Sequence, residues 1–363
     1  MFANYRYLFP VIILSSLLGQ GFWGNEFPEE KIPYKPKTYV CYKTESPLLI
    51  DGKPNDPDWA KVEWTDSFVD IEGSLKPDPF YDTKTKMLWD ENYFYFYAYM
   101  EDPHVWSTII ERDAVVYKDN DFEVFLDPDG DTHNYYELEI NALGTEWDLL
   151  LLKPYHDVDN WQTTVAIDSW DIIGLKSKVF LDGTINDPSD TDIGWSIEVA
   201  IPWQVLEETT ANFHPEIGEQ WKVNFSRVHW NRDVVNGKYV KTNEREYNWV
   251  WSPQGHIYMH IPELWGLVQF EDIKDSLNSV VFKENNIDKI KWALRQVYYH
   301  QRNYNEKNGF YAKSLEELDL ATSPVSNVPW PPKIHITFSG WEASLVSNEK
   351  TYYIRKDGLV WIE

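Results

Sequence analysis

The chain has 363 residues, of which 43% are hydrophobic, so it can bury a sizeable core and is not expected to be disordered. Its formal net charge of −26 repels phosphate backbones and anionic membrane surfaces, which excludes nucleic acid as a partner. An uncharged polymer is compatible with this charge. Aromatic residues make up 16% of the chain, more than a core of this size requires.

The N-terminal segment has the layout of a secretory signal peptide. Arg6 precedes an apolar run over residues 8–18, and small residues such as Gly19 and Gly24 follow. The run is too short for a comfortable transmembrane helix. We therefore expect residues 1–24 to be removed and the mature protein to be secreted or held in the cell envelope, in the periplasm or at the cell surface. Attachment to a membrane is expected only if this segment stays uncleaved.

Residues 25–37 are rich in proline and charge and predict an extended leader. From residue 38 to 272, short segments of alternating character are separated by turn sequences such as DPDGD and NALG. Many short strands at this spacing predict an antiparallel sandwich or barrel. The predicted strands cover residues 86–89, 93–100, 121–126, 135–142, 148–152, 163–167, 178–181, 194–202, 220–229 and 265–270.

The pattern of apolar residues changes near residue 275. Apolar residues at helical spacing predict a helix over residues 284–307, and Asn308-Gly309 forms a stop signal. Three short strands are predicted at 334–338, 343–347 and 352–355. The predicted fold class is therefore all-β: a jelly-roll-like antiparallel β-sandwich of two sheets over residues 38–272, followed by a small α+β domain over residues 280–363.

Acidic and apolar residues alternate in two of the predicted strands. In the first strand Asp121 and Glu123 share one face, while Phe122 and its alternate neighbours share the other and should face the core. The second strand repeats the pattern with Glu137, Glu139 and Asn141. Facing carboxylates repel one another, and Arg112 or a bound cation would relieve that repulsion. Two interpretations stay open: a solvated outer face, or a carboxylate cluster that accepts hydrogen bonds from sugar hydroxyls.

The sequence DPDGD offers hard oxygen ligands at alternating positions. Asp127, Asp129 and Asp131 resemble the start of a calcium loop, without the distant glutamate of an EF-hand. The alternative is a turn that closes a hairpin. We expect no required cofactor, and the sequence leaves open a structural calcium ion at this loop.

Seven short sequence segments together resemble the family 9 carbohydrate-binding modules. They follow one another over most of the strand-rich region, so the set is far more specific than any single segment. The segments are IDGKPNDPDW (50–59), LWDENYFYFYAYMEDP (88–103), DNDFEVFLDPDGD (119–131), YYELEINALGT (135–145), GWSIEVAIPW (194–203), WKVNFSRV (221–228) and WSPQG with PELWG (251–266).

The resemblance implies a β-sandwich that binds sugar chain ends, often attached to xylan-degrading enzymes. Characterised members clamp the sugar between two tryptophans, and this chain has Tyr117 at one of these positions and Tyr258-Met259 at the other. Glu123 fits the acidic position of the family, whereas Glu139 stands where the family has an arginine. The predicted stacking rings are Tyr117, Tyr258 and Trp251, which lies close to Trp249. Hydroxyls would be oriented by Arg112, Glu123, Glu139 and Asn141.

The expected function is non-catalytic binding of a neutral saccharide or polysaccharide chain end. One alternative is a structural or protein-interaction module that has lost its sugar site. A glycoside hydrolase would use two carboxylates, but no motif singles out such a pair. A b-type haem would take ligands such as Met100, Met259 or His260. The sequence offers no GxSxG motif for a serine nucleophile.

Overall fold

The computed structural model describes residues 27, 30–157, 164–208, 210, 213–272 and 280–363. The predicted signal peptide, residues 1–24, lies outside these ranges. Over the described ranges, no helix combines the length and apolar character that crossing a membrane requires.

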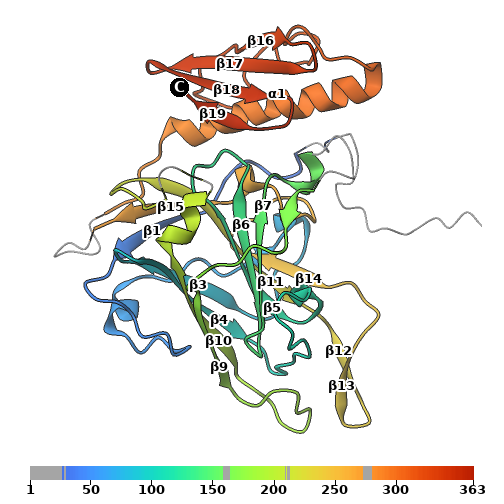
Figure 1. The fold of residues 1–363 in the computed structure, drawn as a ribbon. Coiled ribbons are helices and arrows are strands. Elements are labelled where there is room, and N and C mark those ends of the chain that lie inside the picture. Colours follow the sequence, from blue (N-terminus) through green and yellow to red (C-terminus); the bar gives the residue numbers. More distant parts are fainter. Residues whose placement is uncertain (1–26, 28–29, 158–163, 209, 211–212, 273–279) are drawn as a thin grey trace, which may run out of the picture.

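Most of the chain forms one curled, thirteen-stranded sheet (Figure 1). The strand order is β8-β7-β6-β5-β11-β15-β1-β3-β4-β10-β9, with β14 beside β11 and β2 beside β14. Its strands are β1 (Thr38–Lys43), β2 (Val69–Asp70), β3 (Thr83–Trp89), β4 (Tyr93–Glu101), β5 (Asp121–Asp127), β6 (Tyr135–Asn141), β7 (Glu146–Leu151), β8 (Ala166–Ile167), β9 (Lys176–Asp182), β10 (Gly194–Pro202), β11 (Gln220–His229), β14 (Tyr247–Val250) and β15 (Gly266–Glu271). A separate hairpin joins β12 (Arg232–Val235) to β13 (Lys238–Lys241).

The two halves of the curled sheet face each other and enclose the main core. Phe96 of β4 meets Phe225 of β11 across this core, with ring centroids 5.4 Å apart. On β5, Phe122, Val124 and Leu126 all belong to the core, whereas Glu123 lies on the opposite face of the strand. The predicted orientation of β5 is therefore confirmed, and so is the all-β, sandwich-like fold class.

The two halves are joined to each other, whereas the predicted sandwich consisted of two separate antiparallel sheets. Strand β1 lies between β15 and β3 and is parallel to both, so the halves join into one mixed sheet. Alternation in the sequence reports which face a residue takes and says nothing about strand direction. The sequence could therefore place these strands but not their relative orientation.

The C-terminal part is a helix packed on a small antiparallel sheet, as predicted. Its helix, α1 (Asn286–Asn308), starts at the Asn285 side chain, which accepts a hydrogen bond from the Ile287 amide, and ends at Gly309 with a φ of 78°. The sheet consists of β16 (Lys333–Ile336), β17 (Trp341–Ser347), β18 (Lys350–Arg355) and β19 (Val360–Ile362). The predicted strands correspond to the first three.

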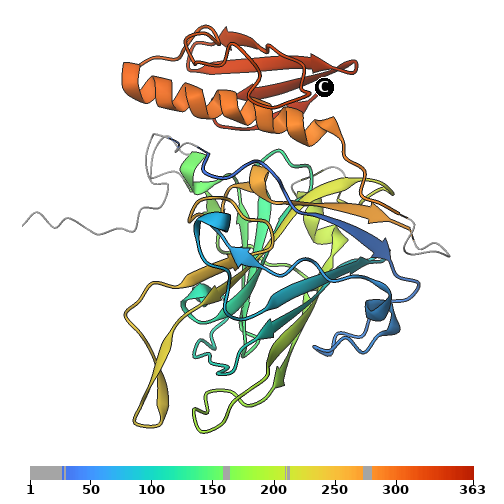
Figure 2. The same cartoon turned by 180° about the vertical axis from the view of Figure 1, so that it is seen from behind.

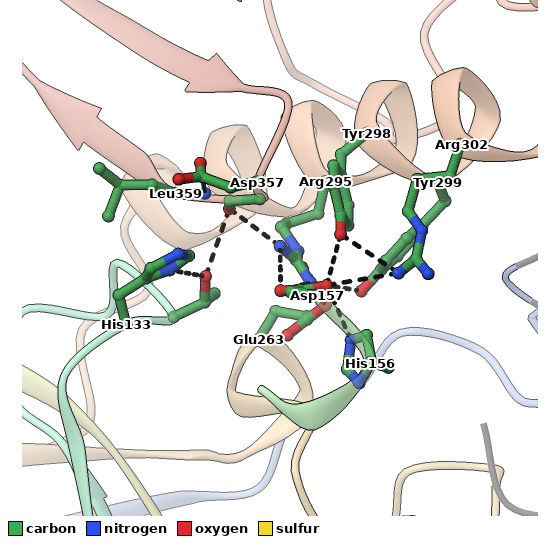
Figure 3. A network of polar contacts seen from close by, with 12 residues as sticks. His133, His156, Asp157, Glu263, Arg295, Tyr298, Tyr299, Arg302, Asp357 and Leu359 are labelled. Atoms are coloured by element: carbon green, nitrogen blue, oxygen red, sulfur yellow. Dashed lines mark hydrogen bonds and ion pairs between the residues drawn. The ribbon is translucent and has the colours of Figure 1, made fainter. Parts of the chain in front are cut away.

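Helix α1 lies between the small sheet and one end of the sandwich (Figure 1 and Figure 2). At this contact Arg295 is fully buried and pairs with Asp157 at 3.3 Å and with Glu263 at 2.8 Å (Figure 3). Burial alone would raise the pKa of Asp157, but Arg295 and His156 hold it well below its ordinary value. These buried ion pairs join α1 to η4 and η6 at the end of the sandwich.

Short 3₁₀ helices connect several strands. They are η1 (Pro57–Lys61), η2 (Gly73–Leu75), η3 (Val116–Lys118), η4 (Tyr155–Asp157), η5 (Trp203–Glu208) and η6 (Pro262–Leu264). Two of them, η3 and η4, bring aromatic side chains to the outer face of β5, β6 and β7.

Candidate carbohydrate-binding cleft

A cleft of about 460 Å³ lies on the face of β5, β6 and β7 that is turned away from the core. Five of the predicted site residues line it together: Tyr117, Glu123, Glu139, Tyr258 and Met259. They come from η3, β5, β6 and the segment that precedes η6, so positions far apart in the sequence meet in one cleft.

Carboxylates form one wall of the cleft. Glu123 of β5 is the direct cross-strand partner of Glu139 of β6, and Glu137 lies two residues before Glu139 on the same face. One oxygen from each of Asp121, Glu123 and Glu139 can lie within 4.8 Å of the others. All are at least nine-tenths buried.

The burial of these groups changes how they hold protons. Burial raises the pKa of Glu123 to about 7. Burial and then the charge of Glu123 raise the pKa of Glu137 and of Glu139 well above the ordinary value. The cleft therefore offers both donor and acceptor oxygens near neutral pH, which suits hydroxyl groups that donate and accept.

Aromatic rings stand beside these carboxylates. Tyr117 is 40% exposed, and its ring stacks beside that of Trp147 with centroids 6.4 Å apart and an interplanar angle of 29°. Tyr155 and Tyr258 also line the cleft, and both contact the ring of His260. Flat apolar faces beside hydrogen-bonding groups match the two surfaces that a sugar ring presents.

The structure places three predicted site residues outside the cleft. Trp251 is 1% exposed and packs in the main core, 5.9 Å from the Phe225 ring, so it presents no face to a ligand. Arg112 is held by Asp148 at 2.6 Å and Asp171 at 3.1 Å, and by Glu146. It therefore does not neutralise the carboxylates of the cleft.

Asn141 is fully buried and holds the turn that follows β6. Its side-chain amide donates to the Ile109 carbonyl at 2.8 Å, and its oxygen accepts from the amides of Leu143 and Thr145, each at 3.0 Å. The side chain is thus committed to the backbone, which corrects its predicted role in orienting hydroxyls.

Sequence reasoning missed several residues of the cleft. Trp147 is the cross-strand partner of Glu139 on β7, a relation that only the strand register reveals. Glu137 follows the same alternating pattern as Glu139, and this pattern would have been sufficient to include Glu137 among the predicted site residues. Tyr155, Glu246 and His260 come from loops and a 3₁₀ helix, where no periodic pattern points to a shared site.

The acidic loop after β5 brings its three aspartates together. One oxygen of each of Asp127, Asp129 and Asp131 can lie within 4.8 Å of the others. Asp127 is fully buried and accepts hydrogen bonds from the amides of Gly130 and Thr132, both at 3.0 Å. Three convergent oxygens fit a hard cation such as calcium. The Lys291 ammonium group sits beside them and donates to the Gly130 carbonyl at 2.9 Å.

The candidate haem ligands do not share one site. Met100 is fully buried in the main core, whereas Met259 and His260 border the cleft. His260 instead forms a 3.0 Å hydrogen bond with the Tyr135 hydroxyl.

Comparisons with known proteins found one matching family and several similar solved structures. Residues 50–248 match the carbohydrate family 9 binding domain-like family, which is more than half of the chain. A family 9 module from Caldicellulosiruptor kristjanssonii in complex with cellotriose is similar at 18% identity, with a TM-score of 0.42, over 69% of this chain and 100% of that one. The same organism's module in complex with glucose is similar at 18% identity, with a TM-score of 0.41, over 66% and 99%.

Among curated proteins, none matches the chain. The matched residues contain β3 to β6 and most of the cleft wall, including Tyr117, Glu123 and Glu139. The match covers the first six of the seven sequence segments, and the seventh, at 251–266, lies just beyond it. The chain therefore belongs to the carbohydrate family 9 binding domain-like family.

Proposed function

We propose that the cleft on β5, β6 and β7 binds a saccharide and that the protein acts without catalysis. The observation that carries this proposal is the half-exposed Tyr117 ring, stacked beside Trp147 and next to the row of carboxylates. Membership of the family supports the ligand class. A sugar ring would stack on these rings, and its hydroxyl groups would exchange hydrogen bonds with Glu123 and Glu139.

The arrangement of the carboxylates favours binding over hydrolysis. Glu123, Glu137 and Glu139 lie side by side on neighbouring strands of one wall. A glycosidase needs two carboxyl groups that flank the scissile bond. Neighbours on one wall contact the same side of a ligand, so they do not provide that geometry.

We further propose that the protein is exported, on the strength of the signal-peptide pattern in residues 1–24. N-terminal sequencing of the protein recovered from the native host tests this point. A mature chain that begins after residue 24 would support export, and an intact N-terminus in the cytoplasm would contradict it.

Calorimetric titration of the full chain with glucose, cellotriose and longer neutral oligosaccharides tests saccharide binding. We expect binding to the wild type, with a loss of affinity of at least about tenfold in Tyr117→Ala and in Trp147→Ala, because each change removes a stacking face. Phe338→Ala is the matched control, since Phe338 is a fully exposed ring in the small C-terminal sheet region.

Two results would count against the site. Unchanged affinity in both cleft variants would place the sugar elsewhere. Absence of binding across a full glycan array would favour the alternative of a structural or protein-interaction module.

A further inference from the structure

The carboxylate wall of the cleft is not neutralised by the protein. Within the described parts of the chain, no basic side chain lies within ion-pair distance of Asp121, Glu123, Glu137 or Glu139. Arg245, the basic residue that lines the cleft, is half-exposed and lies 3.8 Å from Glu246 instead. Arg112 is committed to another acidic cluster.

Some other buried acids of this protein are paired with cations. Asp157 is fully buried against Arg295 at 3.3 Å, and Asp102 is fully buried between Arg227 at 3.4 Å and Arg232 at 3.1 Å. Uncompensated burial of carboxylates costs free energy, and proteins normally offset it with such partners. Glu198 and Asp119 are also buried without a cation, but each accepts at least three hydrogen bonds from the protein. The cleft wall has no cation and fewer such hydrogen bonds.

Hydrogen bonds within the protein satisfy only part of this wall. Glu139 accepts a hydrogen bond from the Tyr117 amide at 2.8 Å, and Asp121 accepts one from the Val228 amide at 3.2 Å. The Oε2 atom of Glu137 is buried and has no protein partner, although Glu137 lines the cleft and is only 5% exposed. The Oδ2 atom of Asp121, behind the cleft lining, is also buried and has no protein partner. Buried polar atoms are normally hydrogen-bonded, and the Glu137 oxygen, which borders the cleft, is placed to accept a hydrogen bond from a ligand.

The rest of the cleft is suited to an organic cation. Rings of Tyr117, Trp147 and Tyr155 line it, and aromatic faces attract a positive charge through their quadrupole. Ammonium groups also donate several hydrogen bonds, which the free carboxylate oxygens can accept.

We propose that the ligand of the cleft is a saccharide that carries a protonated amino group, bound at Glu137 and Glu139 beside the rings. This inference rests on the proposed saccharide-binding function and specifies its ligand class. A bare divalent cation is less well matched, because it requires oxygen ligands on all sides. In this cleft three carboxylates stand on the β5–β6 wall, Glu246 lies beside Arg245, and rings and a methionine take other sides.

Calorimetric titration of the full chain at neutral pH with three matched sugars tests the proposal. The probes are glucosamine, glucose and N-acetylglucosamine, which differ only at one substituent. We expect glucosamine to bind at least about tenfold more tightly than the other two, since only its amine is charged. Short oligosaccharides of glucosamine and of glucose extend the comparison to chain ends.

Isosteric variants identify the groups that bind the amine. Glu137→Gln and Glu139→Gln keep the shape of each side chain but prevent it from ionising against a bound ammonium group, so we expect each to reduce the preference for glucosamine to about threefold or less. Glu306→Gln, an exposed change on α1, should leave the preference intact. Unchanged circular dichroism and melting of the variants would establish that the fold is retained.

The outcomes separate the two proposals. Equal or tighter binding of glucose would overturn the amino-sugar inference and leave saccharide binding standing. Binding of glucose only in the presence of calcium would also overturn it, because the wall would then hold a metal ion. Absence of binding to any of these sugars or oligosaccharides would contradict both.

Discussion

Glu123 of β5 and Glu139 of β6 are direct cross-strand partners inside the cleft, and both carboxylates are buried. Like charges at directly opposed positions destabilise a sheet. Protein stability is thus lower here than it would be with neutral side chains. A cost of this kind at a cleft is typical of a site that is completed by its ligand.

The first prediction concerns pH. Burial raises the pKa of Glu123 from 4.5 to about 7. The acids that interact with it are Asp121, Glu137, Glu139 and Glu246, and Ser226 is its hydrogen-bond donor. The folded protein therefore keeps the Glu123 proton to a higher pH than the unfolded chain does. The resulting contribution to the free energy of unfolding is fully present below about pH 4.5 and is lost as the pH rises through about 7.

Glu123→Gln mimics the protonated form at every pH. We expect it to be about as stable as wild type near pH 5 and more stable by up to about 3 kcal/mol above pH 8, as measured by urea unfolding. A stability difference that does not change over this range would contradict the shifted pKa.

The second prediction concerns the contact between α1 and the sandwich. Arg295→Met leaves Asp157 and Glu263 buried without their shared partner, so we expect a loss of about 3–5 kcal/mol in the free energy of unfolding. Arg355→Met is the control, since its 2.8 Å pair with Asp357 is partly exposed and should contribute less than about 1 kcal/mol. Equal losses in the free energy of unfolding of the two variants would show that burial does not increase the contribution of the Arg295 ion pairs.

The third prediction separates core from cleft tryptophans. Trp251→Ala should lower the free energy of unfolding by about 3–5 kcal/mol, because it empties a fully buried position. Trp147→Ala should cost clearly less, since this ring is only partly buried beside the cleft. The reverse order in thermal melting would mean that the two rings have been assigned to the wrong environments.

The fourth prediction concerns calcium at Asp127, Asp129 and Asp131. An ion that binds only the folded state raises its melting temperature with concentration. We expect millimolar calcium to raise the melting temperature of the wild type and to have little effect on Asp129→Asn, which keeps the shape of an exposed ligand. Identical melting with calcium and with a chelator would argue against a metal site in this loop.

Local alternation accounts for what the sequence predicted well. The period of two along β5 assigned Phe122 to the core and Glu123 to the outer face, and both assignments hold in the structure. The same local signals placed β10 and β11 at the observed residues. The C-cap signal at Gly309 likewise marked the end of α1.

Relations between distant segments account for the errors. Trp251 follows β14 and turns into the core, so its proximity to Trp249 in sequence gave no information about exposure. Arg112 was assigned to the cleft by charge alone, but Asp148 and Asp171 hold it elsewhere. Trp147 enters the cleft through its register with Glu139, and strand register depends on the assembled sheet.

A crystal structure of the full chain with the tightest-binding saccharide is the most direct test of the cleft. We expect the sugar ring to lie against Tyr117 or Trp147, with a polar substituent within hydrogen-bond distance of Glu137 or Glu139. A saccharide bound to another surface, with this cleft vacant, would contradict the proposed site.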